Sequence, residues 1–108
     1  MTIADAISVV TSGKATLIDV RTNKEYADGH AKGAKNFDVS LLVAGHDPGY
    51  PKDHQLYLYC RSGARAQHAQ AVLERMGYQK VINLGALASW EAAGGQTATG
   101  AVCKVEYN

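Results

Sequence analysis

The run CRSGAR at residues 60–65 holds the side chains of this sequence that are best suited to covalent chemistry. The apolar segment before it, QLYLY at 55–59, predicts a strand, and apolar residues at helical spacing after it predict a helix that ends at Gly77. Cys60 is therefore expected at a strand-to-helix turn. Unpaired backbone N–H groups and the helix dipole at such a turn stabilise a thiolate, which is the nucleophilic form of cysteine.

The residues that follow Cys60 favour an anionic substrate. Gly63 lets the loop curl until successive backbone N–H groups converge, and Arg61 and Arg65 add donors that suit a tetrahedral oxyanion. In the alternative interpretation, Cys60 is a small buried residue in a tight turn and both arginines are solvated. We favour the nucleophile, because a structural turn needs neither the two arginines nor a glycine three residues after the cysteine.

Helices and strands that alternate along the chain must position this loop. Capping boxes, in which a Thr and an acidic residue three positions later cap a helix, begin helices at Thr2 and Thr22. The predicted helices run from Thr2 to Gly13, from Thr22 to about Gly29, and over residues 41–43, 66–76 and 86–93. The predicted strands cover residues 15–20, 34–37, 55–59 and 81–84, a loop covers 44–54, and the tail 96–108 is an edge strand or loose.

This alternation predicts an α/β fold, in which a central, mainly parallel sheet carries helices on both faces. Functional sites in such folds gather beyond the carboxyl ends of the strands, where Cys60 is expected. At 108 residues the chain has the size of one domain, with a core expected over about residues 15–95 and a tail over 96–108.

The composition excludes several classes of protein. A hydrophobic content of 46% with only 2 prolines argues against disorder. The net charge of +1 offers no general field for nucleic acid or a membrane surface, although residues 60–80 alone carry 4 basic and 1 acidic groups, a net of +3. No apolar run approaches the roughly 18 residues of a membrane span and no signal peptide is visible. We expect a cytoplasmic protein, or a periplasmic one if a signal peptide was removed.

Cysteine and histidine usage indicates neither a metal site nor a disulfide scaffold. Cys60 and Cys103 are the two cysteines, and the four histidines are scattered along the chain, so no metal and no cofactor is expected. Cys103 could resolve an oxidised or persulfidated Cys60. A tail thiol without a spacing relation to Cys60 is more often incidental.

Five motifs in this order and spacing resemble the rhodanese superfamily. They are LIDVR (17–21), EYADGHAKGAKNF (25–37), CRSGAR (60–65), MGYQKVINLGA (76–86) and SWEAAG (89–94). The small single-domain thiosulfate sulfurtransferases, including the phage-shock type, are the nearest match. The resemblance implies a rhodanese-like three-layer fold.

The resemblance also implies a role for each residue of the loop. Cys60 is the expected sulfur acceptor, which becomes a persulfide. The expected cradle for the substrate consists of Arg61, Ser62, Gly63, Ala64 and Arg65. In the implied cycle, Cys60 takes the outer sulfur of thiosulfate, releases sulfite, and passes the sulfane sulfur to cyanide or another thiophilic acceptor. The expected partners are therefore thiosulfate and cyanide or a thiol acceptor, with no nucleic acid and no membrane.

Three positions depart from the usual pattern of that family. Ala31 stands where Ile is usual, Lys32 where Pro is usual, and Ala86 where a second Gly is usual. These positions are structural, so we expect them to change local geometry more than chemistry.

Other polar and aromatic residues have structural interpretations. Asp19 and Arg21 follow a predicted strand and are expected to form an ion pair, with orientation of the loop or substrate as the alternative. His30 is expected to be a structural hydrogen-bonding group, because an ionised thiolate needs no general base. Trp90 is expected in the core.

Three rival functions remain open at this point. Tyrosine phosphatases and arsenate reductases also use a thiolate in a loop that opens a helix, but the phosphatase loop has five residues between Cys and Arg. Cys60 and Arg65 enclose only four. A non-catalytic binding module would not need the nucleophile and both arginines. In the third possibility, the persulfide is delivered to a protein thiol acceptor.

Overall fold

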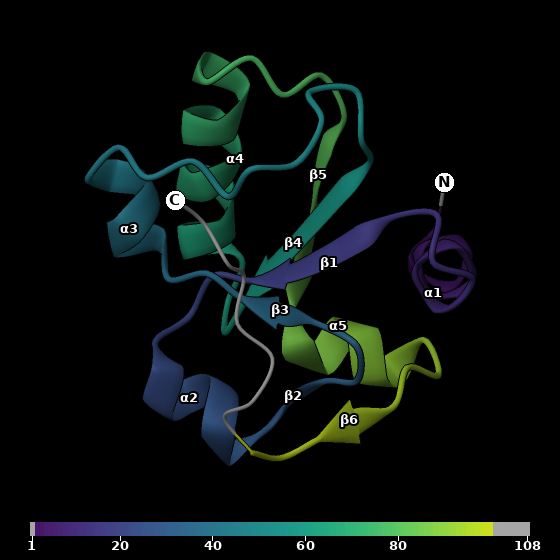
Figure 1. The fold of residues 1–108 in the computed structure, drawn as a ribbon. Coiled ribbons are helices and arrows are strands. Elements are labelled where there is room, and N and C mark those ends of the chain that lie inside the picture. The colour runs from purple at the N-terminus through teal and green to yellow at the C-terminus, as the bar shows by residue number, and fades with distance from the viewer. Residues whose placement is uncertain (1, 101–108) are drawn as a thin grey trace.

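Four parallel strands form the central sheet of the protein, for which a computed structural model describes residues 2–100. The strands lie in the order β3-β1-β4-β5 (Figure 1). They span Thr16–Asp19 (β1), Lys35–Asn36 (β3), Leu56–Cys60 (β4) and Val81–Ala86 (β5). Each of the four predicted strands is present. β5 extends two residues further than predicted, and β4 includes Cys60 as its last residue.

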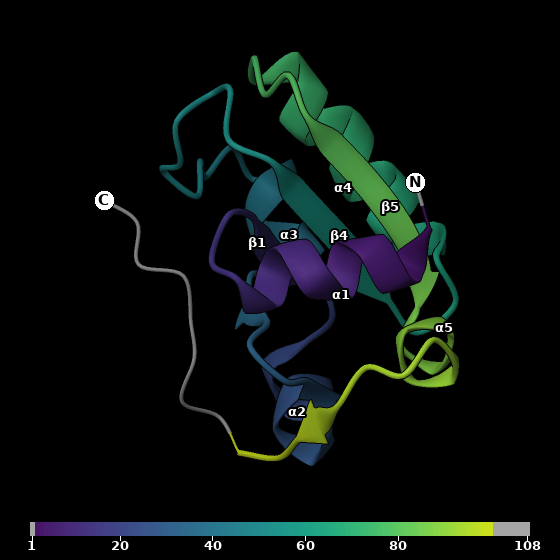
Figure 2. The same cartoon turned by 90° about the vertical axis from the view of Figure 1, so that its right-hand side faces the viewer.

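Helices cover both faces of this sheet, which confirms the predicted α/β fold (Figure 2). One face packs against α3 and α4, and the other against α1, α2 and α5. The helices span Ile3–Thr11 (α1), Asn23–Asp28 (α2), Val39–Val43 (α3), Ala64–Arg75 (α4) and Leu87–Ala92 (α5). Among residues 2–100, no helix is both long and apolar enough to cross a membrane.

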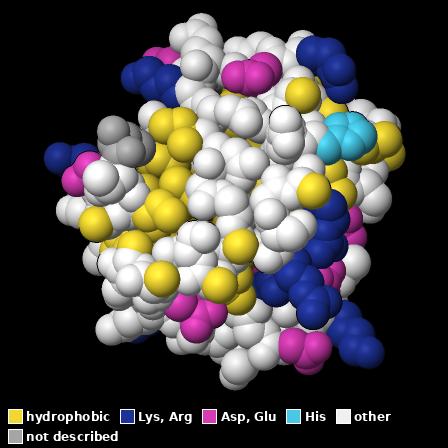
Figure 3. All heavy atoms as spheres, turned by 180° about the vertical axis from the view of Figure 1, so that it is seen from behind, with side chains coloured by type: hydrophobic (Ala, Val, Ile, Leu, Met, Phe, Trp, Pro, Cys, Tyr) yellow, Lys and Arg dark blue, Asp and Glu magenta, His cyan; other side chains and the backbone are white. Residues whose placement is uncertain are grey.

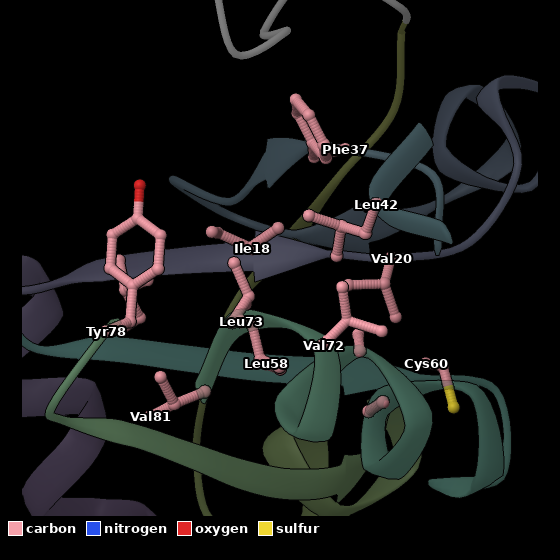
Figure 4. Packing of buried hydrophobic residues seen from close by; sticks show 13 residues of the cluster. Ile18, Val20, Phe37, Leu42, Leu58, Cys60, Val72, Leu73, Tyr78 and Val81 are labelled. Atoms are coloured by element: carbon pink, nitrogen blue, oxygen red, sulfur yellow. The ribbon is translucent and has the colours of Figure 1, made fainter. Parts of the chain in front are cut away.

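Alternation along the strands separates the core into two layers of side chains. Ile18 and Leu58 point toward α3 and α4, whereas Leu17 and Tyr57 point toward the opposite face. Because both faces of the sheet are covered, every residue of the central strand β4 is buried. Figure 4 shows the first layer, with Cys60 at one end of it. The side chain of Cys60 thus lies on the face covered by α4.

Both predicted capping boxes are formed. The Thr2 hydroxyl accepts from the Asp5 N–H of α1, and the Thr22 hydroxyl accepts from the Glu25 N–H of α2. Ala6 of α1 is fully buried against the sheet, so the packed core includes residues that precede position 15.

A second, two-stranded antiparallel sheet was not predicted. It pairs β2 (His30–Ala31) with β6 (Thr97–Ala98). Strands of two residues are too short to show an alternating pattern, which explains why the sequence gives no signal for them. β6 falls within the predicted tail, and residues 101–108 of that tail lie outside the described part of the chain.

The turn after α5 is packed against Trp90, which is buried as predicted. A Cβ atom at Gly95 would lie only 2.2 Å from Trp90 Nε1, so no larger residue fits there without displacing the indole. A Cβ atom at Gly29 would meet nothing within 4 Å, and its φ of 167° is extended backbone open to any residue.

We therefore expect Gly95→Ala to lower the free energy of unfolding by about 1–3 kcal/mol, the usual cost of overpacking. Gly29→Ala, the matched control, is expected to change it by less than about 0.5 kcal/mol. Urea denaturation followed by circular dichroism measures both values. Equal effects of the two substitutions would contradict the close packing of Gly95 on Trp90.

Candidate functional site

Cys60 lies where β4 ends and the turn into α4 begins, as predicted. Its Sγ atom accepts a hydrogen bond from the Gly63 N–H, with a distance of 2.9 Å between nitrogen and sulfur. Gly63 has a φ of +94°, a left-handed conformation that side-chain-bearing residues rarely adopt. Cys60 itself is fully buried, with 0% of its surface exposed. The sulfur therefore lies beneath the turn formed by residues 61–63.

The end of β5 supports this turn from behind. A Cβ atom at Gly63 would lie 3.3 Å from Gly85 Cα, so the two backbones approach closely. The Asn83 side chain bridges them: its Nδ2 donates to the Gly63 carbonyl at 3.1 Å, and its Oδ1 accepts from the Gly85 N–H at 2.7 Å. The sequence analysis missed this role of Asn83. An Asn within an otherwise apolar strand was the available signal.

Arg65 forms an ion pair with Glu25, 40 positions earlier in the chain. Its Nη1 and Nη2 atoms donate to Glu25 Oε1 and Oε2 at 2.7 and 2.9 Å. Hydrogen bonding from Arg65 is the main cause that lowers the pKa of Glu25 to about 2. The same contact raises the pKa of Arg65, with a smaller contribution from the neighbouring Cys60. The structure thus brings Arg65 near Cys60 but pairs its guanidinium with a carboxylate that the sequence analysis assigned only to helix capping.

The remaining residues of the expected cradle lie on the surface. Arg61, Ser62 and Ala64 are exposed. Arg61 also contributes to an open pocket of about 500 Å³ beside the turn. The pocket is lined by two arginines, three carboxylates, a glycine and two apolar residues, namely Arg21, Arg61, Glu25, Asp28, Glu91, Gly29, Leu87 and Ala88. Viewed from behind, the largest cluster of Lys and Arg side chains lies at the lower right of the molecule, and further Lys and Arg side chains lie at its other edges (Figure 3).

Asp19 and Arg21 form the predicted ion pair, which is buried. Asp19 Oδ2 accepts from Arg21 Nη2 at 2.7 Å and from the Tyr59 hydroxyl at 2.6 Å. The Tyr59 hydroxyl in turn accepts from the Ala31 N–H at 2.9 Å. Burial, with the nearby Asp19 carboxylate, raises the pKa of Tyr59, so its hydroxyl keeps the proton that it donates. This network joins the carboxyl ends of β1 and β4 to β2.

His30 makes the structural contacts that the sequence predicted. Its Nδ1 atom lies 2.8 Å from the Tyr26 carbonyl oxygen, and its ring stacks on the Tyr26 ring with centroids 3.8 Å apart. Within residues 2–100, no group of three His, Cys, Asp or Glu side chains is arranged to hold a metal ion. Cys103 lies outside the described residues.

Comparison with known proteins identifies relatives of this architecture. The sequence model of a family described as "Rhodanese-like domain" matches residues 2–93. A protein named sulfurtransferase from Allochromatium vinosum is 38% identical over 79 residues, which cover 72% of this chain and 73% of that protein. A human thiosulfate:glutathione sulfurtransferase is 32% identical over 97 residues, which cover 77% of this chain and 84% of that protein.

The fold is likewise similar to that of a solved structure. The human single-domain sulfurtransferase TSTD1 superposes with a TM-score of 0.76 at 27% identity, covering 85% of this chain and 94% of that chain. Some other curated relatives are much longer, and the chain spans only 20% of their length.

The bridging role of Asn83 can be tested without a measurement of activity. Asn83→Leu removes both hydrogen bonds and is expected to cost about 1–3 kcal/mol of unfolding free energy, because the Gly85 N–H loses the Asn83 oxygen and the Gly63 carbonyl keeps only the Gln67 N–H. It should also shift the amide resonance of Gly63 in a ¹H–¹⁵N spectrum. The matched control is Gln70→Leu, which removes a 2.9 Å hydrogen bond from α4 to the Val81 carbonyl but leaves the turn untouched. If both variants shifted the Gly63 resonance equally, the hydrogen bonds of Asn83 would have no specific role in fixing the turn.

The Glu25–Arg65 ion pair makes stability depend on pH in a defined direction. Because the folded-state pKa of Glu25, about 2, lies below the ordinary value of 4.5, its contribution is complete above about pH 4.5 and is lost as the pH falls toward 2. Glu25→Gln keeps a residue suited to the capping box and removes the charge. We expect the unfolding free energy of this variant to fall less steeply between pH 5 and pH 2.5.

At pH 7 the Glu25→Gln variant should be less stable than the wild type by about 1 kcal/mol or less, since both side chains of the pair are partly exposed to solvent. The control is Glu74→Gln, at an exposed carboxylate that makes no ion pair among residues 2–100. Urea titrations at a series of pH values provide the comparison. If the unfolding free energies of Glu25→Gln and Glu74→Gln changed equally with pH, the ion pair would not be the source of the pH dependence.

Proposed function

The chain belongs to the family of rhodanese-like domains, and on that premise we propose that it is a sulfurtransferase that carries sulfane sulfur on Cys60. The observation that carries this proposal is the hydrogen bond from the Gly63 N–H to Cys60 Sγ at the start of α4. The names of the relatives from Allochromatium vinosum and human agree with sulfur transfer.

The start of α4 is suited to negative charge on the sulfur. In three other helices, α1, α2 and α3, the N-cap side chain of Thr2, Thr22 or Asp38 accepts a hydrogen bond from one backbone N–H of the first turn. The N-cap of α4 is Gly63, which has no side chain to cap the helix. The first N–H groups of this twelve-residue helix thus remain available to a thiolate, a persulfide or an incoming anion.

Thiosulfate is the proposed sulfur donor. Cys60 thiolate attacks the outer sulfur, a new S–S bond forms, and the S–S bond of thiosulfate breaks so that sulfite leaves with the electron pair. An acceptor then attacks the terminal sulfur of the persulfide, and Cys60 leaves as a thiolate. With cyanide as acceptor the product is thiocyanate. The two displacements conserve electrons and return the enzyme to its initial state.

Access to Cys60 requires movement of the turn above it. Cys60 has no exposed surface, whereas Arg61 and Ser62 are exposed. We assign the first contact with the incoming anion to Arg61, because it lies at the rim of the neighbouring pocket. Arg65 is paired with Glu25 in the free protein, and an anion above the turn would compete with that carboxylate for the guanidinium.

A thiol is the proposed alternative to cyanide as acceptor. The name of the human relative supports this choice, since it specifies thiosulfate and glutathione. The pocket beside Arg61 also contains carboxylates of Asp28 and Glu91. Its mixture of charges suits a thiol that carries both an ammonium and a carboxylate group. A cysteine on a protein is the corresponding macromolecular acceptor.

The covalent step is tested by intact mass after incubation with thiosulfate, which should add one sulfur atom to the protein. Steady-state kinetics with thiosulfate and cyanide should give parallel double-reciprocal plots, because the persulfide forms and discharges at one thiol. Cys60→Ser should abolish both the added mass and turnover, while Cys103→Ser, the matched control, should retain them.

Four outcomes would contradict this mechanism. Turnover that persists in Cys60→Ser, or sulfur found on Cys103 in the wild type, would assign the chemistry to another residue. Intersecting kinetic plots would require both substrates to be bound together. Hydrolysis of aryl phosphates at or above the rate of sulfur transfer would favour a phosphatase despite the short interval between Cys60 and Arg65.

A further inference from the structure

A second pocket, of about 610 Å³, lies at the opposite end of the sheet from Cys60. Thr16, the first residue of β1, lines this pocket, whereas Cys60 ends the parallel neighbour β4. Residues of α1, β1, β3 and α5 contribute to its wall, together with residues of the segments after α1, before β3 and after α5. The lining comprises Ile7, Val10, Thr11, Gly13, Ala15, Thr16, Leu17, Lys32, Gly33, Lys35, Trp90, Gly94 and Gln96.

One side of this pocket is fixed by hydrogen bonds before any ligand arrives. The Gln96 carbonyl accepts from Trp90 Nε1 at 2.9 Å and from the Lys32 N–H at 2.8 Å. Gly95 is packed so closely on the indole that a Cβ atom would overlap it. A ligand would therefore bind a preformed wall and lose little affinity to its reorganisation.

The wall combines an apolar floor with positive charge. Ile7 and Val10 supply partly exposed aliphatic surface next to the buried Leu17 and Trp90 side chains, and Lys32 and Lys35 supply two ammonium groups. No Asp or Glu is among the lining residues, and neither lysine makes an ion pair within residues 2–100. The Lys32 ammonium donates a hydrogen bond to the Gln96 side-chain oxygen at 3.4 Å. The positive charge at this apolar surface is thus uncompensated.

We propose that this pocket binds a small amphipathic carboxylate. Its hydrocarbon part would cover Ile7 and Val10 beside the edge of Trp90, and its carboxylate would lie between Lys32 and Lys35. A volume of about 610 Å³ is within the range of roughly 300–1,000 Å³ that is typical of small-molecule sites. An uncharged apolar molecule would leave both ammonium groups unpaired, and a small hydrophilic anion would leave the floor in contact with water. The binding is independent of the proposed chemistry at Cys60.

Trp90 provides a direct readout, because it is the single tryptophan of the chain and lines this pocket. We expect octanoate to change its fluorescence saturably, with a Kd below about 1 mM. Octanol, which has the same hydrocarbon length without the charge, and acetate, which has the charge without the hydrocarbon, should each bind at least about fivefold more weakly. Amide resonances of Gly13, Gly33 and Gly94 should shift with octanoate, while that of Gly63 should not.

Variants test whether the two lysines of the pocket contribute to carboxylate binding and whether this binding is independent of Cys60. Lys32→Gln and Lys35→Gln should each raise the Kd for octanoate at least about threefold, and Lys14→Gln, at an exposed lysine that does not line the pocket, should leave it unchanged. Cys60→Ser should bind octanoate as the wild type does, so loss of sulfur transfer and loss of this site are distinguishable. A Trp90 fluorescence change that rises linearly with octanoate concentration and does not saturate would show that the pocket does not bind octanoate specifically. Equal affinity for octanol and octanoate, or no effect of Lys35→Gln, would show that its lysines take no part in recognition.

Discussion

The geometry around the sulfur depends on one backbone conformation, that of Gly63. Its positive φ turns the chain from β4 into α4 and directs its N–H at Cys60 Sγ, while its Cα surface rests on Gly85. A residue with a side chain would meet both a strained φ and a neighbour at 3.3 Å. The same absence of a side chain leaves the start of α4 without a side-chain cap. One glycine thus sets the path of the loop and leaves the N–H groups that an anion can use.

Two ion pairs near this loop have different physical character. Asp19 is fully buried, and it accepts hydrogen bonds from Arg21 and Tyr59 that offset the cost of removing its charge from water. The Glu25–Arg65 pair is partly exposed, so solvent screens it and separation of its charges costs less. The first pair fixes the ends of the strands. The second joins α2 to the start of α4 through a contact that solvent can reach.

Local patterns predicted most of the fold, and contacts between distant residues account for what was missed. The Thr2 and Thr22 capping boxes and the apolar segment that forms β4 each involve residues within a few positions of one another. The Glu25–Arg65 pair joins residues 40 positions apart, and nothing in the spacing of either residue indicates the other. The capping box with Thr22 already explained the presence of Glu25, so the sequence indicated no second partner for its carboxylate. The sequence predicted the position of Cys60 at the turn between β4 and α4, but the side chains that surround this turn could not be read from it.

Strand β1 connects the pocket lined by Leu17 with the buried hydrogen-bond network of Asp19. Leu17 lines the apolar pocket, and Asp19, two residues later on the same face of the strand, is held in the buried network with Tyr59. Moving β1 lengthwise would break the hydrogen bonds of Asp19 while it is still buried, which is costly. The strand is therefore a rigid spacer between the pockets. A ligand at Leu17 would add its binding free energy to the stability of the fold without displacing the loop that contains Cys60.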